Sequence, residues 1–202
     1  MNTDLRKFSP STARNREPIF AVLQRILPAT AQVLEIGSGS GEHGVHCCQQ
    51  LPGIRWQPTE YHAEDLPSIA AWRTWSNLGN LAPPQVLRLE DEHWPVSAAD
   101  AVVAINVLHY SPWASTAALF AGAARILSEG GIVYCYGPYR RDGEHTAPSN
   151  ASFDDWLKNI DPRFGVRDLE AVVATAAAAG FALNEVIPMP ANNFSLVFTK
   201  TV

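Results

Sequence analysis

Residues 33–41 read Val-Leu-Glu-Ile-Gly-Ser-Gly-Ser-Gly. The apolar, β-branched first half predicts a short strand over 32–36, and the pattern of residues 42–51 predicts a helix directly after the glycines. Glycines at 37, 39 and 41 let the backbone turn tightly and come close to a ligand. Amide groups at the start of the helix then face that ligand. The stretch therefore predicts a strand–turn–helix unit with a ligand at its turn.

The same alternation of strand and helix continues along the chain, which predicts a doubly wound α/β fold with a mostly parallel seven-stranded sheet. Residues 190–192 are too few for a crossover helix, so the last two strands should form an antiparallel C-terminal hairpin. The predicted strands are 32–36, 54–59, 85–89, 100–106, 132–136, 181–189 and 193–199, and the predicted helices are 18–27, 42–51, 65–78, 115–127, 152–159 and 168–179.

Composition and charge limit the possible partners. The chain has 202 residues, of which 47% are hydrophobic and 17% charged, and this fits a single domain over residues 1–202. A formal net charge of -5 gives no electrostatic footprint for nucleic acid or for an anionic membrane surface. We therefore expect neither nucleic acid nor a membrane as a partner, and the oligomeric state is left open.

The cysteines and the N-terminus bear on metal binding and location. Cys47, Cys48 and Cys135 have neither the spacing of zinc ligands nor a Cys-x-x-Cys pattern, so we expect no metal and reduced thiols. The sequence starts without the apolar core of a signal peptide, and it has no apolar run long enough to cross a membrane. These observations predict a cytoplasmic protein.

Carboxylates and glycines around the turn discriminate between its possible ligands. A dinucleotide fingerprint that begins at Gly37 needs a glycine where this chain has Glu42, and the formal match at 39, 41 and 44 begins two residues too late. Glu35 would crowd a pyrophosphate but suits a ligand with an α-ammonium group, directly or through water. Glu60 follows the second strand, where a carboxylate accepts hydrogen bonds from both ribose hydroxyls of either ligand class. The turn therefore favours S-adenosylmethionine over a dinucleotide.

Six segments of the chain carry a resemblance to a known family. Glu-x-Gly-x-Gly-x-Gly at 35–41 resembles motif I of the class I methyltransferases. Over about residues 8–200 the chain resembles the DUF938 family, a group that includes methyltransferase-like protein 26 and is itself poorly defined in function. The five further segments are Ala-Arg-Asn-Arg-Glu-Pro-Ile at 13–19, Trp-Gln-Pro-Thr-Glu at 56–60, Ile-Asn-Val-Leu-His-Tyr-Ser-Pro at 105–112, Tyr-Gly-Pro-Tyr at 136–139 and Met-Pro-Ala-Asn-Asn at 189–193.

The resemblance implies a class I methyltransferase fold and an S-adenosylmethionine cofactor. After the third strand the family usually has Leu-Asp-Val, whereas this chain has Leu89-Glu90-Asp91, so either carboxylate is a candidate for the adenine amino group. The full set of candidate cofactor residues is Arg14, Asn15, Glu35, Gly37, Ser38, Gly39, Gly41, Glu60, Tyr61, Glu90, Asp91 and Asn106.

A second set of residues follows the fourth and fifth strands, where the methyl acceptor is expected. His109 is the candidate general base, because a neutral imidazole can take a proton from a hydroxyl or amine; the alternative is that it closes the pocket or binds backbone. Tyr136 is the other candidate catalytic residue. Tyr110, Trp113 and Tyr139 are expected on the substrate side, as amphipathic walls of the acceptor site.

The predicted function is methyl transfer from S-adenosylmethionine to an unidentified small molecule, leaving S-adenosylhomocysteine and needing no metal. The first alternative is a non-catalytic S-adenosylmethionine-binding sensor or partner protein of the same fold. The second is a dinucleotide-dependent oxidoreductase, which Glu35 and Glu42 disfavour.

The N-terminal residues 1–13 are polar and contain Ser and Pro, so we expect a flexible arm that acts as a lid over the cofactor. Methyl transfer requires water to be excluded, and a parallel sheet leaves its ligand open above the strand ends. Arg14 can pair with the cofactor carboxylate, and Asn15 can bind the same group or the acceptor. The alternative is that Asn15 caps the first helix and Arg14 is solvated.

Overall fold

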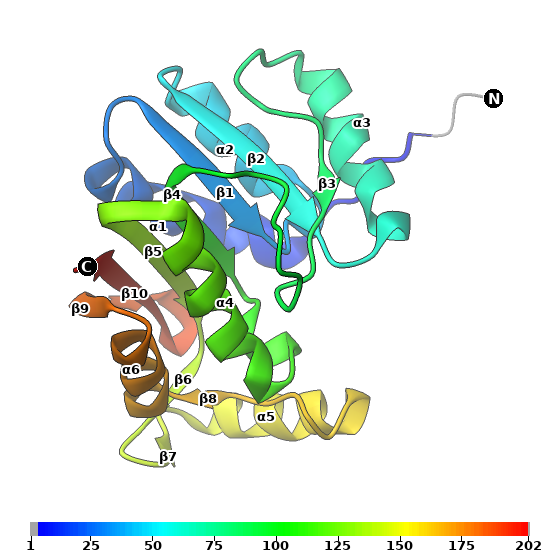
Figure 1. The fold of residues 1–202 in the computed structure, drawn as a ribbon. Helices are drawn as coiled ribbons and strands as arrows, with labels where there is room; N and C mark the ends of the chain where they lie inside the picture. The colour runs from blue at the N-terminus through cyan, green and yellow to red at the C-terminus, as the bar shows by residue number, and fades with distance from the viewer. Residues whose placement is uncertain (1–3, 202) are drawn as a thin grey trace. The chain divides into compact units, whose positions relative to one another are not determined.

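The computed structural model describes residues 4–201 and divides into two compact units, one ending at Val103 and the other beginning at Ala104 (Figure 1). The predicted fold class is confirmed: a seven-stranded, mostly parallel sheet ends in antiparallel C-terminal strands. In sheet order the strands are β3 (Gln85–Val86), β2 (Ile54–Glu60), β1 (Ala31–Ile36), β4 (Ala99–Ile105), β5 (Leu127–Gly137), β10 (Asn193–Lys200) and β9 (Phe181–Met189).

The first unit is built on the parallel pairing of β1 with β2, in which Val33 lies opposite Trp56. Strand β1 is buried at every position but one, as expected for a parallel strand covered on both faces. Helix α2 (Glu42–Gln50) packs against β2 and against two α-helices of the same unit, α1 (Pro10–Ile26) and α3 (Leu66–Ser76). The glycine turn therefore lies between a buried strand and a packed helix, which fixes its position.

The first helix begins eight residues earlier than the predicted start at Pro18, so that prediction is wrong. Ser9 caps the helix by accepting a hydrogen bond from the Thr12 amide over 3.3 Å, and residues 10–13, predicted as part of the arm, form its first turn. Pro18 lies inside the helix, which costs the hydrogen bond that its missing N–H would have given to Arg14. Burial of the apolar side chains of Ile19, Val22 and Leu23 offsets that loss.

Residues 6–8 of the predicted arm contact α3, while residues 1–3 of it lie outside the described residues. The Lys7 amide donates to Ser68 Oγ over 2.8 Å, and the Trp72 indole donates to the Lys7 carbonyl over 2.9 Å. The Arg6 guanidinium carbon lies 4.9 Å from the Trp72 ring and 4.6 Å from the Trp75 ring. The segment thus has specific partners on the neighbouring helix.

The second unit contains the predicted antiparallel hairpin, which is confirmed. β9 pairs with β10 across the Pro190–Asn192 turn, and β10 also pairs antiparallel with β5. Helix α6 (Leu169–Ala178) packs against β9 and against α4 (Trp113–Ile126) (Figure 1). Phe120 of α4 meets Phe198 of β10 at 5.1 Å between ring centroids, in the fully buried core of this unit.

A small second sheet in this unit was not predicted from the sequence. Its strands are β6 (Tyr139–Arg141), β7 (Glu144–His145) and β8 (Arg167–Asp168), with helix α5 (Pro148–Ile160) between the last two in the chain. Strands of two or three residues are too short to show an alternating pattern. Within residues 4–201, no helix has both the length and the apolar character needed to cross a bilayer.

The Ser9 cap gives a first prediction. Ser9→Ala removes the side-chain acceptor for the Thr12 amide and should lower the free energy of unfolding by about 1 kcal/mol in chemical denaturation. Ser149→Ala is the control, since Ser149 is an exposed serine in the first turn of α5, whose cap residue is Ala147. Equal stability of the two variants would mean that the helix does not depend on a start at Ser9.

Candidate functional site

The glycine turn connects β1 to α2 through three left-handed residues, with φ of 64° at Gly37, 60° at Gly39 and 94° at Gly41. At Gly41 a Cβ atom would lie 3.0 Å from the Cα of Ile69, so α3 packs directly on the turn there. At Gly39 a Cβ would meet no atom within 4 Å, so packing does not explain that glycine. The turn is thus closed on the α3 side and open at Gly39, where a ligand can approach the backbone.

Glu60, at the end of β2, lies across the open side of the turn. Its Oε1 accepts a hydrogen bond of 2.5 Å from the Gly39 amide, and its Oε2 accepts one of 3.1 Å from the Tyr61 amide. Desolvation by burial raises the pKa of this carboxyl above its ordinary value, against the lowering effect of the two amides. The structure therefore brings Glu60 together with the predicted glycine turn.

Ser38 ties the turn to the end of β2. Its amide donates to the Thr59 carbonyl over 2.8 Å, and its hydroxyl oxygen accepts from the Thr59 amide over 3.1 Å. Ser38 is buried, so this pair of bonds satisfies polar groups that water does not reach. Ser38, predicted as a cofactor residue, thus has a structural partner in the protein.

Glu35 lies beneath the turn with only 1% of its surface exposed. Its Oε2 accepts a hydrogen bond of 2.9 Å from the Trp56 indole. Desolvation raises the pKa of the Glu35 carboxyl to about 7, and hydrogen bonds from Ser38 and Trp56 oppose the rise. A Cβ on Gly44 of α2 would lie 2.9 Å from the same indole nitrogen, so Gly44 makes room for Trp56. The formal third glycine of the dinucleotide-like pattern thus has a packing role.

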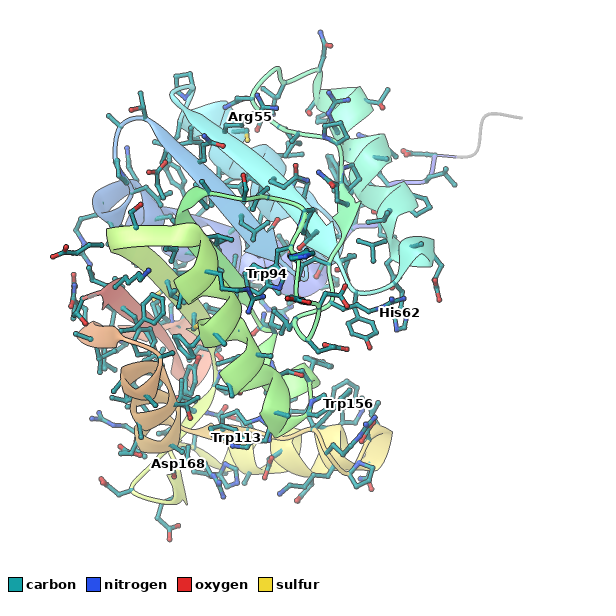
Figure 2. All side chains as sticks on the ribbon, viewed as in Figure 1. Arg55, His62, Trp94, Trp113, Trp156 and Asp168 are labelled. Atoms are coloured by element: carbon teal, nitrogen blue, oxygen red, sulfur yellow. The ribbon has the colours of Figure 1, made fainter. Side chains whose placement is uncertain are left out.

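Tyr61 and Glu90 join the segments that follow β2 and β3. The Tyr61 hydroxyl donates to Glu90 Oε1 over 3.0 Å, and Tyr61 is 45% exposed. His62, labelled in Figure 2 beside the end of β2, meets Tyr61 edge-on at 4.7 Å. Asp91 follows in an exposed turn, where its amide donates to the Arg88 carbonyl. The choice between Glu90 and Asp91 as the adenine partner stays a prediction.

Arg14 and Asn15 lie within α1 and not at its start, so the alternative role of Asn15 as helix cap is wrong. Arg14 is exposed. Asn15 is 8% exposed, and its buried Oδ1 has no hydrogen-bond partner among residues 4–201. A buried amide oxygen without a partner is costly unless a ligand or water binds it, so Asn15 stays a candidate cofactor residue.

In the second unit, Asn106 and His109 converge on Gly137 after β4 and β5. Asn106 adopts a left-handed φ of 59°, and its amide donates to the Tyr136 carbonyl over 2.8 Å. A Cβ on Gly137 would lie 2.9 Å from His109 Nδ1 and Cε1 and 3.8 Å from Asn106 Oδ1. Glycine at 137 is therefore what lets the His109 ring pack against β5.

His109 is a buried, neutral imidazole. Its surface is 2% exposed, and desolvation, with a smaller effect of the Arg167 charge, lowers its pKa to about 3. Its Nε2 is buried and has no hydrogen-bond partner among the residues that the structure describes. His109 thus has a vacant hydrogen-bonding atom but little basicity near neutral pH.

The predicted substrate-side aromatics divide into exposed and buried side chains. Tyr110 and Trp113 are each 41% exposed, and Trp113 lies under the Arg167 guanidinium at 5.8 Å. Tyr136 and Tyr139 are 4% and 2% exposed, and burial raises the pKa of Tyr139 well above its ordinary value. Tyr139 is therefore a core side chain, and Tyr110 and Trp113 are the ones available at the surface.

Sequence reasoning missed three aromatic residues that gather around Tyr110. The Tyr110 ring centroid lies 6.1 Å from Phe153, 6.1 Å from Trp156 and 6.4 Å from Phe164. Trp156 projects from α5 and is 49% exposed (Figure 2). The available signal was the spacing of Phe153, Trp156 and Ile160, which places them on one face of a helix. Over residues 4–201, no three His, Cys, Asp or Glu side chains are grouped as metal ligands.

Comparison with known proteins places the chain beside methyltransferases. The family model described as "Protein of unknown function (DUF938)" matches residues 6–200. An O-methyltransferase family protein from Burkholderia thailandensis is similar, with a TM-score of 0.80 and 17% sequence identity; the match covers 95% of this chain and 57% of that protein's chain. An O-methyltransferase family 2 protein from Planctomyces limnophilus, in complex with apigenin, has a TM-score of 0.78 and 21% identity, covering 95% and 60%.

Human N-acetylserotonin methyltransferase, in complex with SAM, is similar, with a TM-score of 0.78 and 14% sequence identity; the match covers 95% of this chain and 53% of that protein's chain. At these identities the likeness shows the fold, which is that of the class I methyltransferases. The chain spans between 53% and 60% of the length of these three proteins, so the comparison assigns none of their activities or substrates to this chain.

The buried Glu35 carboxyl gives a prediction about pH. Its pKa is raised in the folded protein, so the unfolded chain loses this proton first, and the stability from protonated Glu35 is lost as pH rises from 4.5 to about 7. Glu35→Gln keeps an acceptor for Trp56 but does not ionise. Its unfolding free energy relative to the parent protein should therefore increase by about 3 kcal/mol across that range, at about 1.4 kcal/mol per pH unit.

The measurement is denaturant unfolding at several pH values, with Glu129→Gln as the control because Glu129 is exposed. The control should run parallel to the parent protein at every pH. If Glu35→Gln also ran parallel to the parent, the carboxyl would titrate normally and its burial would have no energetic effect.

Proposed function

Because this chain belongs to the DUF938 family and has the fold of the class I methyltransferases, we propose that it transfers a methyl group from S-adenosylmethionine to a small molecule. The observation that carries the proposal is the Glu60 carboxylate lying across the open side of the glycine turn, 2.5 Å from the Gly39 amide. A ribose with two free hydroxyls can donate one hydrogen bond to each carboxylate oxygen. The open space above Gly39 suits close approach of the rest of the ligand.

The first unit supplies groups that fit each part of S-adenosylmethionine. Glu60 accepts from the ribose, and Tyr61 offers an exposed ring to the adenine, whose amino group donates to Glu90 or Asp91. The unpartnered Asn15 Oδ1 is an acceptor for the α-ammonium group, and exposed Arg14 is the counterion for the carboxylate. Glu35 supports the turn indirectly, because its hydrogen bond holds the Trp56 indole in place. Asn106, in the second unit, stays a candidate for the sulfonium side.

S-adenosylmethionine, when bound, supplies an activated methyl group, so that the acceptor atom gains a methyl carbon and loses a proton while S-adenosylhomocysteine remains. A side chain with a pKa of about 3 is a poor general base at neutral pH, so we assign His109 a positioning role. Its neutral Nε2 accepts a hydrogen bond from the acceptor and orients it. The acceptor proton then passes to solvent.

One alternative function is that of a non-catalytic protein that binds S-adenosylmethionine and signals its level. Binding alone does not separate the two functions, because both retain Glu60 and the glycine turn. Transfer of a labelled methyl group separates them.

Cofactor binding is tested by calorimetry with S-adenosylhomocysteine. The parent protein should bind it, and Glu60→Gln should weaken binding by about tenfold or more, the scale of one lost hydrogen bond to a charged group. Glu92→Gln is the control, because Glu92 is an exposed carboxylate in the same unit. Unchanged affinity in a folded Glu60→Gln protein would remove Glu60 from the ribose site, and absence of binding in the parent protein would refute the proposed function.

Catalysis is tested with S-adenosylmethionine labelled in its methyl carbon and an extract of small metabolites. A methyltransferase should move the label into a small molecule only when the protein is present, and Glu60→Gln should reduce that transfer at limiting cofactor. A protein that binds S-adenosylhomocysteine but moves no label from any extract would be the non-catalytic alternative.

A further inference from the structure

We propose that the methyl acceptor is a flat, uncharged aromatic molecule bearing a hydroxyl group, held on the aromatic cluster formed by Tyr110, Phe153, Trp156 and Phe164. The inference rests on the proposed function and names the class of substrate. All four side chains and His109 belong to the second unit.

The cluster is a set of ring faces that are only partly covered. Phe153 and Trp156 are stacked with 5.6 Å between centroids and 19° between planes, and Tyr110 meets Trp156 nearly at right angles, at 81°. Tyr110 and Trp156 are 41% and 49% exposed. Half-exposed rings at right angles offer one face to stack on and one edge to meet, which suits another aromatic ring better than a flexible aliphatic chain.

The backbone that carries Tyr110 is held by hydrogen bonds, so a ligand does not need to order this part of the cluster. The Arg167 side chain donates from Nε to the Leu108 carbonyl over 2.9 Å and from a terminal nitrogen to the Ser111 carbonyl. The Gly165 amide donates to the His109 carbonyl over 3.0 Å. The turn that carries Tyr110 is thus bound on both sides of that residue, and preorganised rings lose little entropy on binding.

His109 provides a buried polar group next to these rings. Its ring centroid is 5.1 Å from Tyr110 and 5.5 Å from Phe153, and its buried Nε2 has no partner within residues 4–201. Leaving such an atom unpaired costs free energy, and a hydroxyl that reaches it recovers that cost. A charged acceptor would lose its hydration in the same place, so the site favours an uncharged one.

A protein partner is the other class of ligand for an exposed aromatic surface, and the structure favours the small molecule. A macromolecule can cover Trp156 and Ile160 on the outer face of α5, but it gains nothing from an unpaired nitrogen inside the unit. The measurements below separate the two, because a surface for proteins has no reason to prefer one small ring compound over its hydroxyl-blocked or saturated analogue.

The experiment measures binding of naphthol by calorimetry to protein saturated with S-adenosylhomocysteine. Two analogues test the two parts of the inference: methoxynaphthalene keeps the rings and cannot donate a hydrogen bond, and decahydronaphthol keeps the hydroxyl without aromatic faces. Naphthol should bind tighter than each analogue by about tenfold, the scale of one net hydrogen bond or of one aromatic stacking contact. Equal affinity for naphthol and either analogue would overturn the inference.

Protein variants locate the binding. Trp156→Leu should weaken naphthol binding by about fivefold or more, the scale of a lost aromatic pair, and leave S-adenosylhomocysteine affinity unchanged. Trp75→Leu is the matched control, because Trp75 is also an exposed tryptophan, at 58% against 49% for Trp156, and lies in the other unit. A loss in Trp75→Leu, or none in Trp156→Leu, would overturn the assignment to this cluster.

The outcomes also distinguish this inference from the proposed function. If S-adenosylhomocysteine binds and naphthol does not, the acceptor class is wrong and the cofactor assignment stands. If S-adenosylhomocysteine itself does not bind, the proposed function fails and the inference fails with it.

Discussion

The hydrogen bond between the buried Glu35 carboxyl and the Trp56 indole is the interaction on which the first unit depends. It joins neighbouring strands beneath the glycine turn, and Gly44 of α2 leaves the space that the indole needs. A carboxyl in an apolar interior is expensive unless a donor meets it, so this pair must form together and in one arrangement. The shape of the turn above it follows from that constraint, since α2 and both strands are positioned by the same contact.

In the second unit the corresponding constraint is steric. Gly137 lacks the Cβ that would collide with the His109 ring, so the imidazole lies directly against β5 and is buried. The same burial suppresses its charge and leaves one ring nitrogen unpaired. The imidazole is therefore uncharged near neutral pH, and in the site we propose its unpaired nitrogen accepts a hydrogen bond from the methyl acceptor.

The sequence predicted the parallel sheet, the glycine turn and the place of Glu60 at the end of the second strand. Each depends on a local pattern: buried β-branched strands, alternate glycines and a carboxylate after a strand. It did not predict the true start of α1, because Pro18 reads as a first-turn residue and the packing that tolerates it inside the helix is tertiary. The short strands around Tyr139 leave no periodic signal. The gathering of Phe153, Trp156 and Phe164 around Tyr110 depends on long-range folding, and so does the burial that lowers the pKa of His109.

Ser68 links the segment before α1 to the glycine turn. Its oxygen accepts from the Lys7 amide over 2.8 Å and its hydroxyl donates to the Ser40 carbonyl over 2.8 Å, so one atom serves both segments. Free-energy coupling is reciprocal, so stabilising the turn also stabilises the attachment of Lys7, and detaching Lys7 destabilises the turn. Under the proposed function, a reporter placed on the exposed side chain of Lys7 would thus respond to S-adenosylmethionine at the turn without a change to the proposed cofactor residues.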